Sequence, residues 1–191
     1  MMIPRSSFAG LPLPQSTGGV AIRECDGLGI ATILARKGRI AALRERLRDR
    51  FGITLPEGAT HSTAGELTLA GTGPGAWLAI HESAGNSFTA SLAETIGDLA
   101  SVSDQSDGYA VLHLSGARIS EILAKLVPID VHPRVFKVGD GAVTLSGHVN
   151  VILWRLEDGP DALPRYQMAL YRSFAESYAS FLVEVAAGAT P

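Results

Sequence analysis

Apolar residues recur along the chain with two different periods, and each period predicts one type of secondary structure. Spacings of three and four residues, typical of the buried face of a helix, occur in four segments. Their apolar positions are Ile40, Leu43, Leu47 and Phe51; Phe88, Leu92, Ile96 and Leu99; Ile119, Ile122, Leu123 and Leu126; and Phe174, Tyr178, Phe181, Leu182 and Val185. Short apolar and β-branched runs predict strands over residues 28–35, 66–70, 76–80, 100–106, 109–114, 142–145, 149–156 and 166–171.

Residues that commonly begin or end helices lie beside these segments. Asn86 or Ser87 can cap the second helix with a side-chain oxygen, and Pro128 stops the third. Ser173 followed by Glu176 forms a capping box that would open the last helix. The end signals therefore agree with the helix positions that the periodicity predicts.

The predicted elements follow the order β-α-β-β-α-β and then begin a second round, which Asp107-Gly108 would join to the first by a two-residue hairpin turn. This is the element order of a split βαβ unit. We expect an α+β fold of two ferredoxin-like halves, residues 20–106 and 107–191, that share an antiparallel sheet and form one compact unit. Residues 1–19, rich in Pro, Ser and Gly, are expected to form an irregular arm outside the core.

Composition adds an expectation about partners. Charged residues make up 18% of the 191 residues, against about 25% in ordinary soluble domains, which favours a surface that is buried against another protein. The net charge of -3 disfavours nucleic acid and anionic membranes as partners. No apolar run reaches the roughly 20 residues that span a bilayer, and Cys25 is the single cysteine, as is usual in a reducing cytoplasm.

Two motifs resemble known binding sites but lack their structural context. Residues 71–76 satisfy a loose dinucleotide fingerprint, yet a strand is predicted to follow them where that fingerprint needs the N-terminus of a helix. We therefore expect a turn. His81-Glu82 begins like a zinc-protease helix, but Gly85 occupies the position of the second histidine ligand.

Other polar groups have structural interpretations that we favour. Asp104, Ser106 and Asp107 are expected to accept local backbone hydrogen bonds in a turn. Seven basic residues lie between positions 36 and 50, and we expect them on a solvated or partner-facing helix. Cys25 is expected to be an inert thiol. We assign no catalytic, cofactor-binding or metal-binding residue in this chain.

Several collinear segments resemble the gamma subunit of heterotetrameric sarcosine oxidase. The resemblance extends from about Gly73 to the C-terminus. The segments are Gly73–Leu78, Val102–Gly116, Ile122–Leu126, Ile129–Pro133 with Phe136 and Gly139, and Arg172–Ser177. The same D-x-S, strand, L-S-G, helix succession is similar to the folate-binding domain of aminomethyltransferases, the T-protein of the glycine cleavage system. Those enzymes carry adjacent acidic residues on a hairpin that works on the pterin, whereas the corresponding residues 148–154 contain none.

The resemblance implies a non-catalytic subunit of a cytoplasmic complex that oxidises sarcosine to glycine, passes the one-carbon unit to tetrahydrofolate and produces hydrogen peroxide from oxygen. It implies alpha, beta and delta partner subunits, mainly the large alpha subunit, which hold FAD, FMN, NAD and tetrahydrofolate; this chain holds no cofactor. The isolated chain is expected to self-associate. The alternatives are a subunit of a related N-methyl amino-acid dehydrogenase, such as N-methylglutamate dehydrogenase, a free-standing folate-binding protein, and, ranked last, a nucleic-acid module built on the arginine helix.

Overall fold

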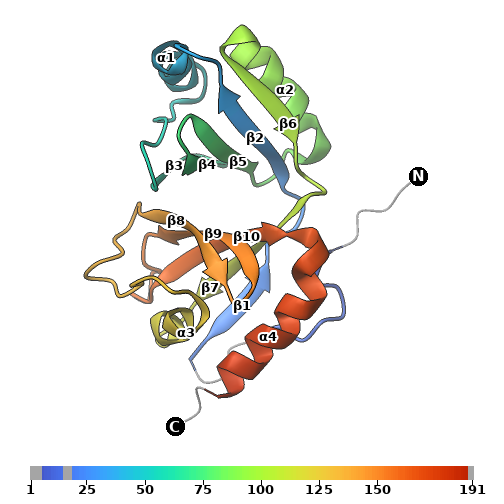
Figure 1. Cartoon of the computed structure of the whole chain (residues 1–191), viewed down its shortest axis with the longest axis vertical. Helices are drawn as coiled ribbons and strands as arrows, with labels where there is room; N and C mark the ends of the chain where they lie inside the picture. Colours follow the sequence, from blue (N-terminus) through green and yellow to red (C-terminus); the bar gives the residue numbers. More distant parts are fainter. Residues whose placement is uncertain (1–5, 15–18, 189–191) are drawn as a thin grey trace. The chain divides into compact units, whose positions relative to one another are not determined.

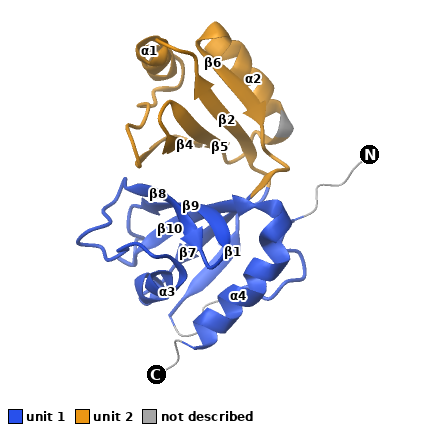
Figure 2. Cartoon of the chain, viewed as in Figure 1, with its two compact units in different colours: residues 1–26, 110–191 blue, residues 27–109 orange. Residues whose placement is uncertain are grey.

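The computed structural model describes residues 6–14 and 19–188, and these form two compact units (Figure 2). Unit 1 comprises residues 1–26 and 110–191, and unit 2 comprises residues 27–109. The chain thus begins in unit 1, builds unit 2, and returns to complete unit 1. This division differs from the sequence-based halves, 20–106 and 107–191, mainly because residues before position 27 belong with the second half.

Unit 2 is a five-stranded antiparallel sheet with helices α1 and α2 packed on one face (Figure 1). The order across the sheet is β3-β4-β5-β2-β6, and each neighbouring pair is antiparallel. The elements are β2 (Gly29–Ala35), α1 (Ile40–Phe51), β3 (His61–Ala64), β4 (Leu67–Gly73), β5 (Ala76–His81), α2 (Phe88–Ile96) and β6 (Ala100–Asp104), with short 3-10 turns at Gly85–Ser87 and Gly97–Leu99.

Unit 1 contains a second five-stranded sheet, in the order β1-β7-β10-β9-β8. Antiparallel pairings join β1 to β7, β10 to β9, and β8 to β9. Helices α3 and α4 pack against the sheet through one hydrophobic core. The elements are β1 (Ala21–Glu24), β7 (Tyr109–Ser115), α3 (Ile119–Leu126), β8 (Gly141–Ser146), β9 (Val149–Leu156), β10 (Arg165–Tyr171) and α4 (Ala175–Ala187), the last preceded by a 3-10 turn at Arg172–Phe174.

The two units repeat one plan. Each has a first strand, a helix, three strands in a meander and a second helix, and in each sheet a further strand lies beside the first strand. In unit 2 that strand is β6, which follows α2, whereas in unit 1 it is β1, which comes from the start of the chain. This relation is not a residue-level repeat, but it makes β3 and β8 equivalent edge strands.

The α+β class is confirmed, but the expected sharing of one sheet by both halves is wrong. Strands β6 and β7 belong to different sheets, so Asp107-Gly108 does not form a hairpin between them. The physical reason is visible at Gly108, whose φ is not positive, whereas the two-residue hairpin turn that an Asp-Gly pair predicts requires a positive φ.

Periodicity identifies most of the core-facing helical residues. Leu43 and Leu47 of α1 are fully buried in unit 2, and the predicted apolar positions of α3 are all buried in unit 1. Phe174 and Ile40 are exceptions, because they are 41% and 40% exposed. The expected arm also contributes to a core, since Phe8 is only 4% exposed and lies in the hydrophobic cluster of unit 1.

The expected capping box on the last helix is wrong. Helix α4 begins at Ala175 with Phe174 at its N-cap, and no side chain makes a capping hydrogen bond there. The 3-10 turn at Arg172–Phe174 places Ser173 inside a turn instead of at the cap position. At α2 the N-cap is Ser87, again without a capping bond, because its hydroxyl donates backwards to the Ala84 carbonyl at 2.8 Å.

Candidate functional site

The glycine-rich segment 71–76 covers the end of β4, the turn at Pro74 and Gly75, and the first residue of β5, so a strand follows the turn. The expected turn is therefore confirmed. The Gly71 amide donates to the Thr60 carbonyl at 2.9 Å, and a β-carbon at position 71 would lie 2.1 Å from the Gly58 carbonyl oxygen. Glycine is required at position 71 for this close backbone approach, which accounts for that part of the motif without a nucleotide.

Asp104 and Ser106 form the hydrogen-bonded turn that the sequence predicts. The Oδ1 atom of Asp104 accepts bonds from the amide of Ser106 at 2.9 Å and from its hydroxyl at 2.7 Å. These bonds from Ser106 hold the pKa of Asp104 below its usual value. The Ser106 hydroxyl also accepts from the Ile30 amide at 3.1 Å, so the D-x-S motif fastens the end of β6 to the start of β2.

His81, which begins the His81-Glu82 motif, and His113 lie in separate settings. His81 is at the end of β5, where its Nδ1 atom accepts from the Ser83 amide at 3.3 Å. His113 lies on β7 opposite Arg23 of β1; burial, and then Arg23 and Arg165, lower its pKa to about 4. Within residues 6–14 and 19–188 no three His, Cys, Asp or Glu side chains form a group able to hold a metal ion.

The basic residues of α1 are largely engaged with neighbouring groups. Arg44 pairs with Glu57 at 2.6 Å, and Arg46 donates to the Thr95 carbonyl at 2.7 Å. An open surface groove of about 550 Å³ lies there, lined by Arg46, Arg50, Glu94 and Thr95. Its lining includes a carboxylate, so it does not present the uniformly positive surface that a phosphate backbone requires.

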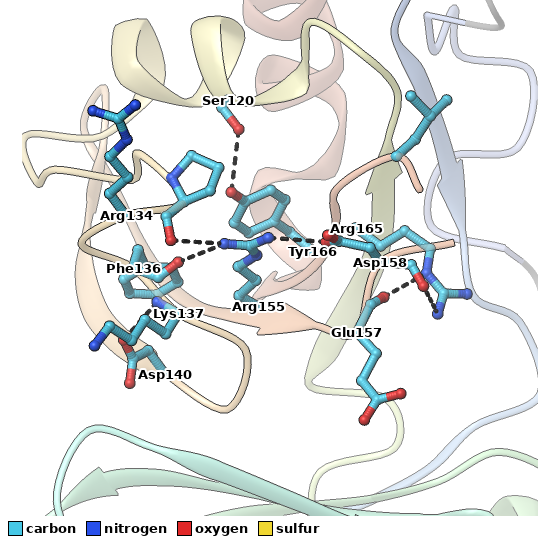
Figure 3. A network of polar contacts seen from close by, with 12 residues as sticks. Ser120, Arg134, Phe136, Lys137, Asp140, Arg155, Glu157, Asp158, Arg165 and Tyr166 are labelled. Atoms are coloured by element: carbon cyan, nitrogen blue, oxygen red, sulfur yellow. Dashed lines mark hydrogen bonds and ion pairs between the residues drawn. The ribbon is translucent and has the colours of Figure 1, made fainter. Parts of the chain in front are cut away.

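A buried arginine organises an extended polar network in unit 1 (Figure 3). Arg155 of β9 is 5% exposed. Its Nη1 atom donates to the Phe136 carbonyl at 3.0 Å and to the Pro133 carbonyl at 3.2 Å. Its Nη2 atom donates to Asp158 at 2.9 Å. The planar fork of a guanidinium suits this task, because it can serve several acceptors at once.

Further contacts hold the loop of residues 131–140 in place. The Arg155 guanidinium lies 5.9 Å from the centre of the Tyr166 ring, and the Tyr166 hydroxyl donates to the Val131 carbonyl at 3.2 Å. Asp140 accepts from the Lys137 amide at 2.7 Å. Residues 131–140 are therefore held in a defined shape. The sequence indicates this loop through its motif residues, but gives no sign that Arg155 positions it.

Exposed apolar side chains occur both on this loop and on the edge strand β8. They are Val135 at 58%, Val138 at 47%, Val143 at 52% and Leu145 at 47% exposure. Val138 lies close to β8, because Gly139 donates to the Arg155 carbonyl on β9, the strand that pairs with β8. Val143 and Leu145 point away from the core of unit 1, because Ala142, between the start of β8 and Val143, packs on that core opposite Leu153, and we call these two residues the β8 surface. It is the candidate functional site of unit 1, and its features are those of a protein-docking surface.

No helix in the described part of the chain combines the length and apolar character needed to cross a membrane.

Comparison with known proteins agrees with this architecture. A family model described as "Sarcosine oxidase, gamma subunit family" matches residues 38–188. The chain is 32% identical to sarcosine oxidase subunit gamma of Corynebacterium sp. (strain P-1), over 89% of this chain and 81% of that protein. It is 30% identical to sarcosine oxidase subunit gamma of Arthrobacter sp, over 79% of this chain and 75% of that protein.

Solved structures share the fold. A chain of heterotetrameric sarcosine oxidase from Corynebacterium sp. U-96, solved in complex with pyrrole 2-carboxylate, matches with a TM-score of 0.78 and 23% identity, over 97% of this chain and 95% of that one. The glycine cleavage system aminomethyltransferase T from Bartonella henselae matches with a TM-score of 0.60 and 15% identity, over 86% of this chain and 45% of that one. From the family model and the curated relatives, this chain belongs to the sarcosine oxidase gamma subunit family.

Proposed function

We propose that this chain is the non-catalytic gamma subunit of a heterotetrameric sarcosine oxidase and that it stabilises the assembly. The observation that carries the proposal is the family match over residues 38–188, together with relatives named as gamma subunits that align over most of their own length. The complex would oxidise sarcosine to glycine, transfer the one-carbon unit to tetrahydrofolate and release hydrogen peroxide.

In this proposal the redox and folate chemistry belongs to the partner subunits. FAD, FMN, NAD and tetrahydrofolate would be held by them, and the alpha subunit would be the main contact. The β8–β9 hairpin supports this assignment, since residues 148–154 contain no carboxylate and an exposed asparagine, Asn150, stands on β9. A carboxylate pair is the group that the folate enzymes place on their hairpin.

The charge deficit of the chain supports a docking role. Only 18% of its residues are charged, and β8 and the loop of residues 131–140 add four exposed aliphatic side chains to unit 1. Water contacts with such a surface are replaced favourably by a partner. The cytoplasm is the proposed location.

Co-expression with the alpha, beta and delta subunits from the same genome tests the proposal. The tagged alpha subunit should retain this chain in equimolar amount, and the chain purified alone should be colourless and should not oxidise sarcosine. Calorimetric titration of the lone chain with tetrahydrofolate should give no heat of binding. Tight folate binding by the lone chain, or failure to co-purify, would support the free-standing folate protein instead. Activity of the purified complex on N-methylglutamate in place of sarcosine would support the related dehydrogenase.

A further inference from the structure

We infer that the free edge of β8 docks an extended segment of a partner subunit, which adds a strand to the sheet of unit 1. The inference rests on the proposed function and gives it a defined surface. The segment would be apolar at alternate positions, where it meets Val143 and Leu145, and would carry carboxylates near Arg134 and Lys137.

Strand β8 lies at the edge of its sheet. It is the last strand of its sheet in the order β1-β7-β10-β9-β8, so one edge faces no strand of the described chain. An edge of this kind presents unpaired amide and carbonyl groups and is a template for a further strand.

The register of the hairpin identifies which backbone groups face outward. The Arg155 amide donates to the Asp140 carbonyl at 2.9 Å, and the register continues to Ser146 opposite Val149. Hydrogen-bonded and non-hydrogen-bonded pairs alternate along an antiparallel ladder. The amides and carbonyls of Val143 and Leu145 therefore point away from β9, and the same two residues carry the exposed side chains of the strand.

Strand β3, the equivalent edge strand of unit 2, can be compared with β8. In unit 2 the equivalent edge strand β3 also ends in a two-residue turn, and its register places Ala64 opposite Leu67 as Ser146 lies opposite Val149. Counting back from the turns, Thr63 corresponds to Leu145 and His61 corresponds to Val143. The edge of unit 2 is thus polar at the positions where the edge of unit 1 is aliphatic. Edge strands are protected by being short or by carrying charges, prolines or bulges; β3 has four residues, whereas β8 has six and contains neither a charged residue nor a proline.

The charges on the loop next to β8 indicate which kind of partner segment would bind there. Arg134 and Lys137 are exposed on the loop beside β8, and Figure 3 shows their side chains directed away from the Arg155 network. In the loop of residues 131–140 these two cations outnumber the one carboxylate, Asp140, whereas the chain as a whole has a net charge of -3. A segment with carboxylates beside its apolar residues is complementary to these two cations.

The experiment uses the four-subunit complex with an affinity tag on the alpha subunit. The double variant Val143→Thr, Leu145→Thr removes the apolar surface but keeps residues that are compatible with a strand. The control is Leu34→Thr, which changes a 57% exposed leucine of unit 2. After dilution, the amount of this chain retained by the tagged subunit is measured. We expect at least a tenfold loss of apparent affinity for the double variant and no change for the control.

A second variant tests the backbone contact. Val143→Pro removes an amide that faces outward, where proline is tolerated in an edge strand, and its melting temperature shows whether the chain is folded. Folded Val143→Pro should also be lost from the complex. Retention of the double variant at the wild-type level would overturn the docking surface while leaving the proposed function intact. If wild-type chain is not retained, the proposed function fails. If the double variant is retained but no longer self-associates when isolated, the surface joins two copies of this chain and the inference is wrong.

Discussion

The hydroxyl oxygens of Tyr178 and Ser146 lie 2.7 Å apart in the core of unit 1, linking α4 to the end of β8. Ser146 is fully buried and Tyr178 is 1% exposed. The Tyr178 hydroxyl also donates to the sulfur of Met168 at 3.0 Å. Burial raises the pKa of Tyr178 to about 12, so the phenol remains a neutral hydrogen-bonding group at physiological pH.

Tyr178→Phe should lower the free energy of unfolding of unit 1 by about 1–3 kcal/mol, because it leaves the buried Ser146 hydroxyl without its partner. Adding Ser146→Ala should recover part of the loss, since both polar groups are then absent. Each unit contains one tryptophan, Trp77 in unit 2 and Trp154 in unit 1. Urea unfolding followed by Trp154 fluorescence in a Trp77→Phe background reports on unit 1. Equal stability of Tyr178→Phe and its parent would show that the hydroxyl pair contributes nothing.

Arg155→Met should release the loop of residues 131–140, because the Pro133 and Phe136 carbonyls lose their donor. Arg155→Lys should behave similarly, since an ammonium group lacks the planar fork. The measurement is the rate of tryptic cleavage after Arg134 and Lys137, which we expect to rise at least tenfold. Arg118→Met, which removes an ion pair with Glu121 at the start of α3 and lies outside this loop, is the control. An unchanged cleavage rate in Arg155→Met would contradict the role given to the network.

His113 should make unit 1 less stable in mild acid. Its folded pKa of about 4 lies below the ordinary value near 6.5, so the unfolded chain binds the proton more readily. The stabilising contribution is fully present above about pH 6.5 and is lost as the pH falls toward 4. Between pH 7 and pH 5 the loss should be roughly 1–2 kcal/mol.

The check on this effect is the pH dependence of the urea midpoint in His113→Asn, compared with His148→Asn at an exposed turn residue. His113→Asn should reduce the difference between pH 7 and pH 5, and His148→Asn should leave it as it is. The opposite ranking of the two variants would show that another group controls acid stability.

Gly71→Ala should destabilise unit 2 by about 1–3 kcal/mol, the usual range for overpacking, because the new methyl group meets the Gly58 carbonyl. Gly73, two residues along the same strand, has no positive φ, and a methyl group added there would have no atom within 4 Å. Gly73→Ala is therefore the matched control and should change stability by less than about 0.5 kcal/mol. Trp77 fluorescence in a Trp154→Phe background gives both values. Similar losses for the two variants would mean that the close approach at Gly71 is not the cause.

The fold can be predicted where local pattern determines structure. Leu43 and Leu47 are recognisable as core residues because helical periodicity records burial directly. Strands β1 (Ala21–Glu24) and β3 (His61–Ala64) escape prediction. Their sequences, AIRE and HSTA, contain little of the apolar alternation that marks a half-buried strand.

The division of the chain into its two units could not be predicted, because it depends on the pairing of β1 with β7, which are far apart in the sequence. Ile22 lies opposite Leu114, and nothing near either residue in the sequence indicates the other. Arg155 illustrates the same limit at the site. Its position in a strand follows from the run VNVILWRL, but its acceptors at Pro133 and Phe136 lie about twenty positions earlier, in a loop whose course no local pattern defines.

In the proposed function, this chain stabilises a sarcosine oxidase assembly without performing its chemistry. The most direct measurement is the thermal stability and native mass of the complex produced with and without this chain, from otherwise identical co-expression of the alpha, beta and delta subunits. We predict that omission lowers the melting temperature or prevents assembly, and that adding the purified chain restores the complex. A three-subunit complex with unchanged mass for the remaining subunits, unchanged melting temperature and full sarcosine oxidation would contradict the account.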